Sequence, residues 1–172
     1  MQNTLSMSRR TTAIAAALSV LALGSPLITA CANPLADNSF NSGVDKYDQG
    51  DYQGAIADFT KVIEIDPQSA VAYYNRGAAK DDLEDYQGAI ADYNKAIEIN
   101  PQYAVAYSNR GNSKNRLGDL QGAIADFTKA IEIDPKFASA YSNRGMSKYL
   151  LGDLKGACYD ARKAADLGDE RS

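Results

Sequence analysis

Beyond the first 35 residues, apolar and small side chains recur every three or four positions, with polar side chains between them. This spacing places the apolar positions on one face of an α-helix. One such face carries Ala89, Tyr93, Ala96 and Ile97. Pro101 ends the pattern, because proline cannot continue a helix.

A second helical pattern precedes this one. Tyr73, Gly77 and Lys80 recur at helical spacing, and Glu84-Asp85 separates the two patterns. At the corresponding places in the chain the pair is Gly-Asp, at Gly50, Gly118 and Gly152. Glycine supplies the left-handed residue after one helix, and aspartate caps the start of the next. The unit is therefore predicted to be a helix, a tight turn and a second helix.

The unit repeats with a period of 34 residues. Four copies span 36–69, 70–103, 104–137 and 138–171, and Pro67, Pro101 and Pro135 close the first three. A fixed period of this length is typical of units that stack on their neighbours to bury what one copy alone cannot bury. The sequence predicts an all-α fold, a right-handed α-solenoid of four stacked helix-turn-helix repeats.

The first 32 residues have a different pattern. Arg9 and Arg10 precede an apolar run over 13–23, and Gly24, Ser25 and Pro26 then break it. This order is typical of a secretory signal, and the break makes the run too short for a transmembrane anchor. We expect residues 1–32 to be a leader and 33–38 a short linker.

Two cleavage sites are compatible with this leader. Ile28-Thr29-Ala30-Cys31 resembles the lipobox of bacterial lipoproteins, in which the cysteine is lipidated and becomes the new N-terminus. Ala30-Cys31-Ala32 also fits an ordinary signal-peptidase site that releases a chain starting at Asn33. We favour lipidation of Cys31, which gives a membrane-anchored lipoprotein of the cell envelope. Cleavage after Ala32 gives a periplasmic or secreted protein.

Composition narrows the function. The net charge is −4, which argues against nucleic acid as a partner, since nucleic-acid binding needs a basic stripe. The chain has no histidine, so the commonest general base and the commonest metal ligand are missing. Cys158 falls at a helical position that holds isoleucine in the other copies, and we expect it to be a small core residue. No catalytic residue, metal or cofactor is expected.

The repeats resemble the tetratricopeptide repeat family. Its order of aromatic, glycine, alanine, aromatic, alanine and proline appears as Tyr107, Gly111, Ala123, Phe127, Ala130 and Pro135. The resemblance implies that the first helices of the repeats line a concave groove that binds a protein or a peptide. The residues that we single out for this groove are Asn41, Tyr74, Asn75, Asp81, Asn109, Asn112, Asn143 and Tyr149.

The asparagines at 41, 75, 109 and 143 recur with the repeat. An amide offers both a donor and an acceptor, so such a ladder suits the backbone of a bound peptide. The alternative is that these side chains serve the packing of the repeats themselves. The lysines and arginines with which one subclass of the family holds chaperone C-terminal tails have no counterparts here, so such tails are disfavoured.

A second periodic set is charged. Arg76, Arg110 and Arg144 recur on the first helices, and Asp58, Asp92, Asp126 and Asp160 recur on the second helices. We expect arginine–carboxylate ties within or between repeats. Ser42 replaces the arginine in the first copy, so one aspartate is expected to lack a partner in its own repeat.

The last copy departs from the others at Ala161, Ala165 and Asp169, which predicts a last helix that caps the array. The function predicted is that of an exported, non-enzymatic interaction scaffold. The alternative is a structural envelope lipoprotein that acts by self-association.

Overall fold

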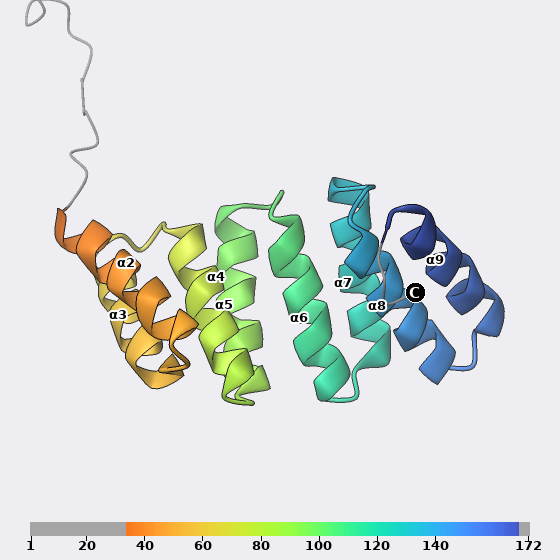
Figure 1. Cartoon of the computed structure of the whole chain (residues 1–172), viewed down its shortest axis with the longest axis horizontal. Coiled ribbons are helices and arrows are strands. Elements are labelled where there is room, and N and C mark those ends of the chain that lie inside the picture. Colours follow the sequence, from red (N-terminus) through yellow and green to blue (C-terminus); the bar gives the residue numbers. More distant parts are fainter. Residues whose placement is uncertain (1–33, 169–172) are drawn as a thin grey trace, which may run out of the picture. The chain divides into compact units, whose positions relative to one another are not determined.

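The computed structural model describes residues 34–168, which form eight α-helices and, within that range, no strand. The helices alternate as first and second helices of four repeats (Figure 1). Their bounds are α2 (Pro34–Asp48), α3 (Tyr52–Ile65), α4 (Ala70–Asp82), α5 (Tyr86–Ile99), α6 (Ala104–Arg116), α7 (Leu120–Ile133), α8 (Ala138–Leu150) and α9 (Leu154–Asp166). The predicted all-α solenoid of helix-turn-helix repeats is confirmed.

The turns between paired helices follow the sequence signals. Gly50, Gly118 and Gly152 have φ values of 79°, 83° and 83°, in the left-handed region that glycine adopts without steric cost. Glu84 fills the same place with a φ of 63°. The aspartate after each of these residues caps the second helix, as Asp85 does by accepting a bond from the Gly88 amide.

Close approach of the paired helices depends on an aromatic ring that faces a glycine. A Cβ atom at Gly111 would lie 2.9 Å from the ring of Phe127, so only glycine fits opposite this ring. Phe127 itself is fully buried. Such pairs recur in the first three repeats, and together with the buried alanines of neighbouring helices they build a core that runs along the array.

The curvature of the array follows from which helices approach one another. Each first helix lies against the next one, as α4 does against α6, whereas consecutive second helices within residues 34–168 stay farther apart. The first helices α2, α4, α6 and α8 therefore lie on the inside of the curve. We call the surface that they form the inner face.

Two expectations concern the start of the chain. The linker expected over 33–38 has to be corrected, because α2 begins at Pro34 and the residues from there to 38 are helical. Proline suits the first helical position, where its missing amide hydrogen leaves no bond unmade. The leader and Cys31 lie outside the described residues.

Candidate functional site

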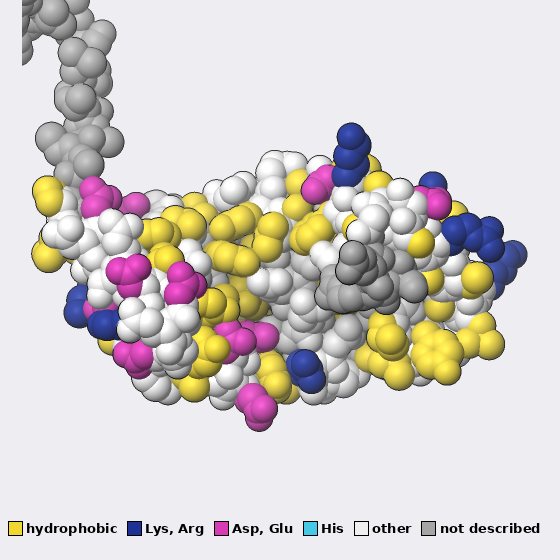
Figure 2. Space-filling model, viewed as in Figure 1, with side chains coloured by type: hydrophobic (Ala, Val, Ile, Leu, Met, Phe, Trp, Pro, Cys, Tyr) yellow, Lys and Arg dark blue, Asp and Glu magenta, His cyan; other side chains and the backbone are white. Residues whose placement is uncertain are grey.

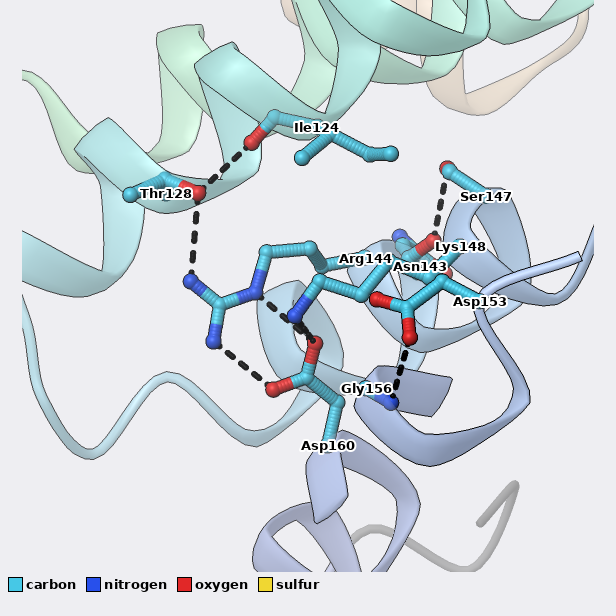
Figure 3. A network of polar contacts seen from close by, with 9 residues as sticks. All are labelled: Ile124, Thr128, Asn143, Arg144, Ser147, Lys148, Asp153, Gly156 and Asp160. Carbon is cyan, nitrogen blue, oxygen red and sulfur yellow. Dashed lines mark hydrogen bonds and ion pairs between the residues drawn. The ribbon is translucent and has the colours of Figure 1, made fainter. Parts of the chain in front are cut away.

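The periodic charges form buried networks inside each repeat. In the fourth repeat, Arg144 donates from Nε and Nη2 to the two carboxylate oxygens of Asp160, at 2.9 and 2.7 Å (Figure 3). Lys148 donates to the same carboxylate at 2.7 Å. Burial alone would raise the pKa of Asp160, but the bonds from Arg144 and Lys148 outweigh it and hold the pKa below its ordinary value.

The arginine also joins neighbouring repeats. Arg144 Nη1 donates to the Thr128 hydroxyl of the preceding repeat at 3.1 Å. Arg76 makes the equivalent bond to Thr60 at 3.1 Å, and Arg110 bonds Asn94 at 2.6 Å. The predicted ties between arginine and carboxylate are confirmed, and one guanidinium serves both its own repeat and the junction.

The first repeat corrects one expectation. Asp58 does have partners in its own repeat, although Ser42 stands in place of the arginine. Ser42 Oγ donates to Asp58 at 2.7 Å, and the two lysines Lys46 and Lys61 donate at 2.5 and 2.6 Å. Those bonds, from Lys46 first and from Lys61, hold the pKa of Asp58 far below its ordinary value.

The equivalent lysines of the other repeats show why Lys61 bonds the aspartate in the first repeat. Lys95 and Lys129 occupy this position in the second and third repeats, and there they pair with Glu98 and Glu132 on the outside of the helix. Where an arginine already holds the aspartate, the lysine turns outward. Where the arginine is absent, Lys61 turns to Asp58 instead.

The inner face carries the periodic asparagines, which differ in whether they bond their own helix or the preceding repeat. Asn75 Nδ2 donates to the Val71 carbonyl of its own helix at 2.8 Å. Asn109 reaches the preceding repeat, where it donates to the Tyr74 hydroxyl at 3.1 Å. Asn143 likewise donates to Asn112 Oδ1 at 3.0 Å. Asn41 is exposed on α2.

The structure thus brings together two pairs of the predicted residues, Tyr74 with Asn109 and Asn112 with Asn143. These amide contacts help to join consecutive first helices, and each Asn side chain retains bonding capacity beyond the bond that it makes here. The remaining predicted residues are spread along the same face rather than gathered at one point. The inner face is an extended surface.

An acidic and aromatic cluster marks the inner face near α2 and α4. The Tyr47 hydroxyl donates to Asp82, and the Ser113 hydroxyl donates to Asp81. Burial raises the pKa of Asp81, in contrast to the lowered pKa of Asp58. Burial and the bond to Asp82 also raise the pKa of Tyr47. Asp81 is therefore an acid whose surroundings disfavour its charge, which is a property of many binding sites.

Sequence reasoning missed two buried serines. Ser113 donates to Asp81, and Ser147 exchanges bonds with Asn115 at 2.8 and 3.1 Å. Both serines are fully buried at a position that holds Ala79 in the second repeat. A hydroxyl at a core position needs a partner, and this signal could have located the bonds between first helices.

The far end of the array is apolar. Met146, Tyr149 and Leu150 on α8 are each 59% exposed, and Leu154 on α9 is 62% exposed. Met146, Tyr149, Leu154 and Cys158 line a hollow of about 390 Å³ between the two helices. The expectation that Cys158 is a core residue is wrong, because its thiol is exposed in this hollow. In residues 34–168 no helix packs over it as α4 packs over α3.

The described part of the chain contains no cluster of three or more acidic or thiol side chains that could hold a metal ion. No helix between residues 34 and 168 is long and apolar enough to cross a membrane.

Models of the tetratricopeptide repeat match residues 70–103 and 104–137, and a model described as TPR repeat matches 43–80. A solved structure of MamA is similar to this chain at 30% sequence identity with a TM-score of 0.75, and the match covers 81% of this chain and 82% of that one. The chain belongs to the tetratricopeptide repeat family.

Two further structures extend the comparison within this family. A MamA segment from Desulfovibrio magneticus RS-1 is 25% identical, with a TM-score of 0.72 and coverage of 77% of this chain and 75% of that one. The first tetratricopeptide domain of Spaghetti (RPAP3), bound to the HSP90 peptide SRMEEVD, is 29% identical, with a TM-score of 0.68 and coverage of 69% and 94%. No curated protein sequence matches the chain.

Proposed function

We propose that this protein is an exported, non-enzymatic scaffold that holds a protein or peptide partner along its inner face. One observation carries the proposal. The inner face displays a row of amide side chains, at Asn41, Asn75, Asn109 and Asn143, on helices whose buried charges are already paired. Paired charges hold the scaffold together, and amides remain to bond a peptide backbone.

The two ends of the inner face suggest what the partner carries. Asp81 and Asp82 with Tyr47 give an acidic and aromatic end, which favours a basic or hydrogen-bond-donating group. Met146, Tyr149 and Leu150 give an apolar end. The partner best suited to this surface is an extended segment with a basic group toward α4 and apolar side chains toward α8.

An acidic C-terminal tail fits less well. The Spaghetti domain was solved with the peptide SRMEEVD, which ends with an acidic residue and has two more just before its valine. Around Asn75 or Asn109, the positions at which the chaperone-binding subclass has basic groups hold uncharged side chains here, such as Phe40, Val44 and Val105. Such a peptide would meet Asp81 and Asp82, whose nearby cation Arg116 already interacts with Asp81.

The experiment is to select a decapeptide from a random library against the full chain and to measure its affinity by calorimetry. The double variant Asn75→Ala with Asn109→Ala is expected to bind it at least about tenfold more weakly, because interfaces concentrate their energy in a few residues. The matched control is Gln87→Ala with Gln121→Ala, which removes two exposed amides from the second helices α5 and α7. Undiminished affinity in the asparagine variant would remove the inner face from the account.

Export and lipidation rest on the leader pattern, and we propose that Cys31 carries the lipid. The intact mass of the mature protein from its own host tests this directly. A chain that begins at Cys31 and carries acyl groups would support a membrane-tethered scaffold. A bare chain that begins at Asn33 would overturn lipidation and keep export.

A further inference from the structure

The junctions between repeats share one contact, and both halves of that contact are altered at the two ends of the array. Inside the array, the arginine of a first helix bonds its own aspartate and reaches Thr60, Asn94 or Thr128 of the preceding repeat. The first helix α2 lacks this arginine and has Ser42. The last helix α9 lacks the threonine or asparagine and has Arg162.

These two changes are complementary. If a first helix with the usual arginine docked on α8 and α9, its guanidinium would lie against Arg162 and be repelled. The helix α2 would place only a serine there. Its neighbour Asp58 is the one periodic aspartate of the described residues that is bonded by a second lysine, Lys61, and by a serine where the others are bonded by an arginine.

We propose that copies of this protein associate head to tail, with α2 of one copy docked on α8 and α9 of another. Arg162 of one copy then lies beside Ser42 of the next and supplies to Asp58 the guanidinium that the first repeat lacks. In the internal junction, one guanidinium spans from the Thr128 hydroxyl at 3.1 Å to Asp160 at 2.7 Å. In the proposed junction the arginine comes from the second helix of one copy instead of the first helix of the next. It joins the same two positions, the one equivalent to Thr128 and the periodic aspartate.

A second observed contact has a counterpart across the proposed junction. The Tyr47 hydroxyl of the first repeat donates to Asp82 of the second. Tyr149 occupies the position of Tyr47 in the fourth repeat, and Asp48 occupies the position of Asp82 in the first. Both side chains are exposed in the single chain. Head-to-tail docking brings them together in the arrangement already present between the first two repeats.

The charges of the two ends favour this arrangement over others. Exposed acids lie on α2, at Asp37, Asp45 and Asp48, and outnumber its one base, Lys46. Exposed bases lie on α9, at Lys155, Arg162 and Lys163, and outnumber its one exposed acid, Asp166. In Figure 2 acidic side chains prevail over α2 at one end of the array, with a few basic ones beside them, and basic side chains prevail toward α9 at the other. Pairing two α9 ends would bring like charges together, whereas α2 against α9 joins opposite charges.

The proposed junction is more polar than the internal ones. Asn38 and Asp45 stand where the second repeat has the buried Ala72 and Ala79. The apolar hollow beside Met146 and Leu154 would therefore face a docked surface that is only partly apolar. We therefore expect a weak and salt-sensitive association, since exposed charges are screened by salt. A head-to-tail contact of this kind builds chains or closed rings rather than an isolated dimer.

The test uses the full chain in mild detergent and follows the sedimentation coefficient as protein concentration rises. Ser42→Arg is expected to weaken association at least about tenfold, because it sets two arginines against each other. The same substitution restores the usual arginine to Asp58, so the variant should melt at or above the temperature of the unchanged protein. Weakened assembly in this variant therefore cannot come from unfolding.

The matched partner is Arg162→Thr, which restores the residue found at positions 60 and 128. Alone it is expected to weaken association by removing the guanidinium from Asp58. An equal mixture of the two variants should assemble again, with the two kinds of copy alternating. Half of the junctions then pair the native Arg162 with the native Ser42, as in the unchanged protein. The other half pair the introduced threonine with the introduced arginine, as inside the array.

Recovery in the mixture would support head-to-tail docking. Three results would overturn it: a strict monomer at all concentrations of the unchanged protein, association that Ser42→Arg leaves unaltered, or a mixture that stays as weak as its components. The second of these results would show that the surface around Ser42 takes no part in association. None of the three would affect peptide binding on the inner face.

Discussion

Asp58 and Asp126 occupy the same position in the first and third repeats, but different cations hold them. Asp126 is bonded by Arg110 and Lys114, whose side chains are only 16% and 22% exposed. Asp58 is bonded by Lys46 and Lys61, which are 37% and 60% exposed. The inner repeat buries its cations under a neighbouring repeat. The first repeat keeps Lys46, the equivalent of Lys114, in a more solvated position, and Lys61 and Ser42 take the place of the arginine.

The comparison shows that a repeat is completed by its neighbour. The arginine of the third repeat is fixed because Asn94 of the second repeat also bonds it. In the described residues α2 follows no other repeat, and the arginine is replaced by Ser42 there. The same buried carboxylate is kept in both places, which indicates that it is structural and that the cations around it adapt.

Removing the carboxylate should cost the third repeat much more than the first. Asp126→Ala leaves Arg110 and Lys114 largely buried without their counter-charge, and removing one member of a buried ion pair typically costs about 3–5 kcal/mol. Asp58→Ala should cost about 1–2 kcal/mol, because exposed lysines return to water. Urea unfolding of both variants measures the difference. Equal losses would show that the exposure of the cations does not matter.

Arg110→Ala should cost about 3 kcal/mol, since it leaves Asp126 with Lys114 alone and breaks the bond to Asn94. The arginine lies beneath the inner face rather than on it, so the affinity of the folded variant for the selected decapeptide should be unchanged. Thermal melting and calorimetry report the two quantities. Unaltered melting together with lost binding would contradict this assignment.

Acid should weaken the fold through the same carboxylates. The pKa values of Asp58 and Asp160 are lowered in the folded state, so their contribution is fully present above the unfolded value of about 3.9 and is lost as pH falls below it. We expect unfolding free energy to fall by at least about 1 kcal/mol between pH 4 and pH 2. Asp58→Asn should flatten that slope, as measured by urea unfolding at each pH. An unchanged slope would mean that the bonds from Lys46 and Lys61 do not persist in solution.

The smallest effect concerns a turn in which the second repeat differs from the others. Glu84 adopts the left-handed φ of 63° that Gly118 and Gly152 adopt freely. Left-handed backbone costs a non-glycine residue about 1 kcal/mol, so Glu84→Gly should stabilise the protein by about that amount. The matched control is Gly118→Glu, for which a similar loss is expected. A stability change of the opposite sign in either variant would exclude this account of the turn.

The sequence specified the fold nearly completely because every repeat carries the same local signals. The period, the turns at Gly50 and Gly118 and the aspartate caps agree with one another, and their agreement leaves one architecture. The arginine–aspartate ties followed from their shared period. Positions at the edges were less predictable, because an edge residue has no copy beside it to show what it contacts.

The inner face was predicted as a location and only in part as a set of contacts. Asn109 and Asn143 lie on the first helices α6 and α8, but their bonds to Tyr74 and Asn112 depend on the offset between neighbouring first helices, which no pattern within one repeat encodes. The same offset explains why the bonds of Ser113 and Ser147 were missed. The burial predicted for Cys158 was wrong for a related reason. The repeat pattern predicts a core position, and only the stacking of the helices shows that the side of α9 carrying Cys158 is exposed.

The inner face is the proposed binding surface, and the side-chain amides of its asparagines report on it without modification of the protein. Their NH₂ groups give separate nuclear magnetic resonance signals from those of the backbone. The account predicts that titration with the selected decapeptide shifts the signals of Asn75, Asn109 and Asn143 and leaves that of Asn94 on α5 in place. Shifts confined to Asn94 and to the backbone of α5 and α7, with the inner-face amides unmoved, would contradict it.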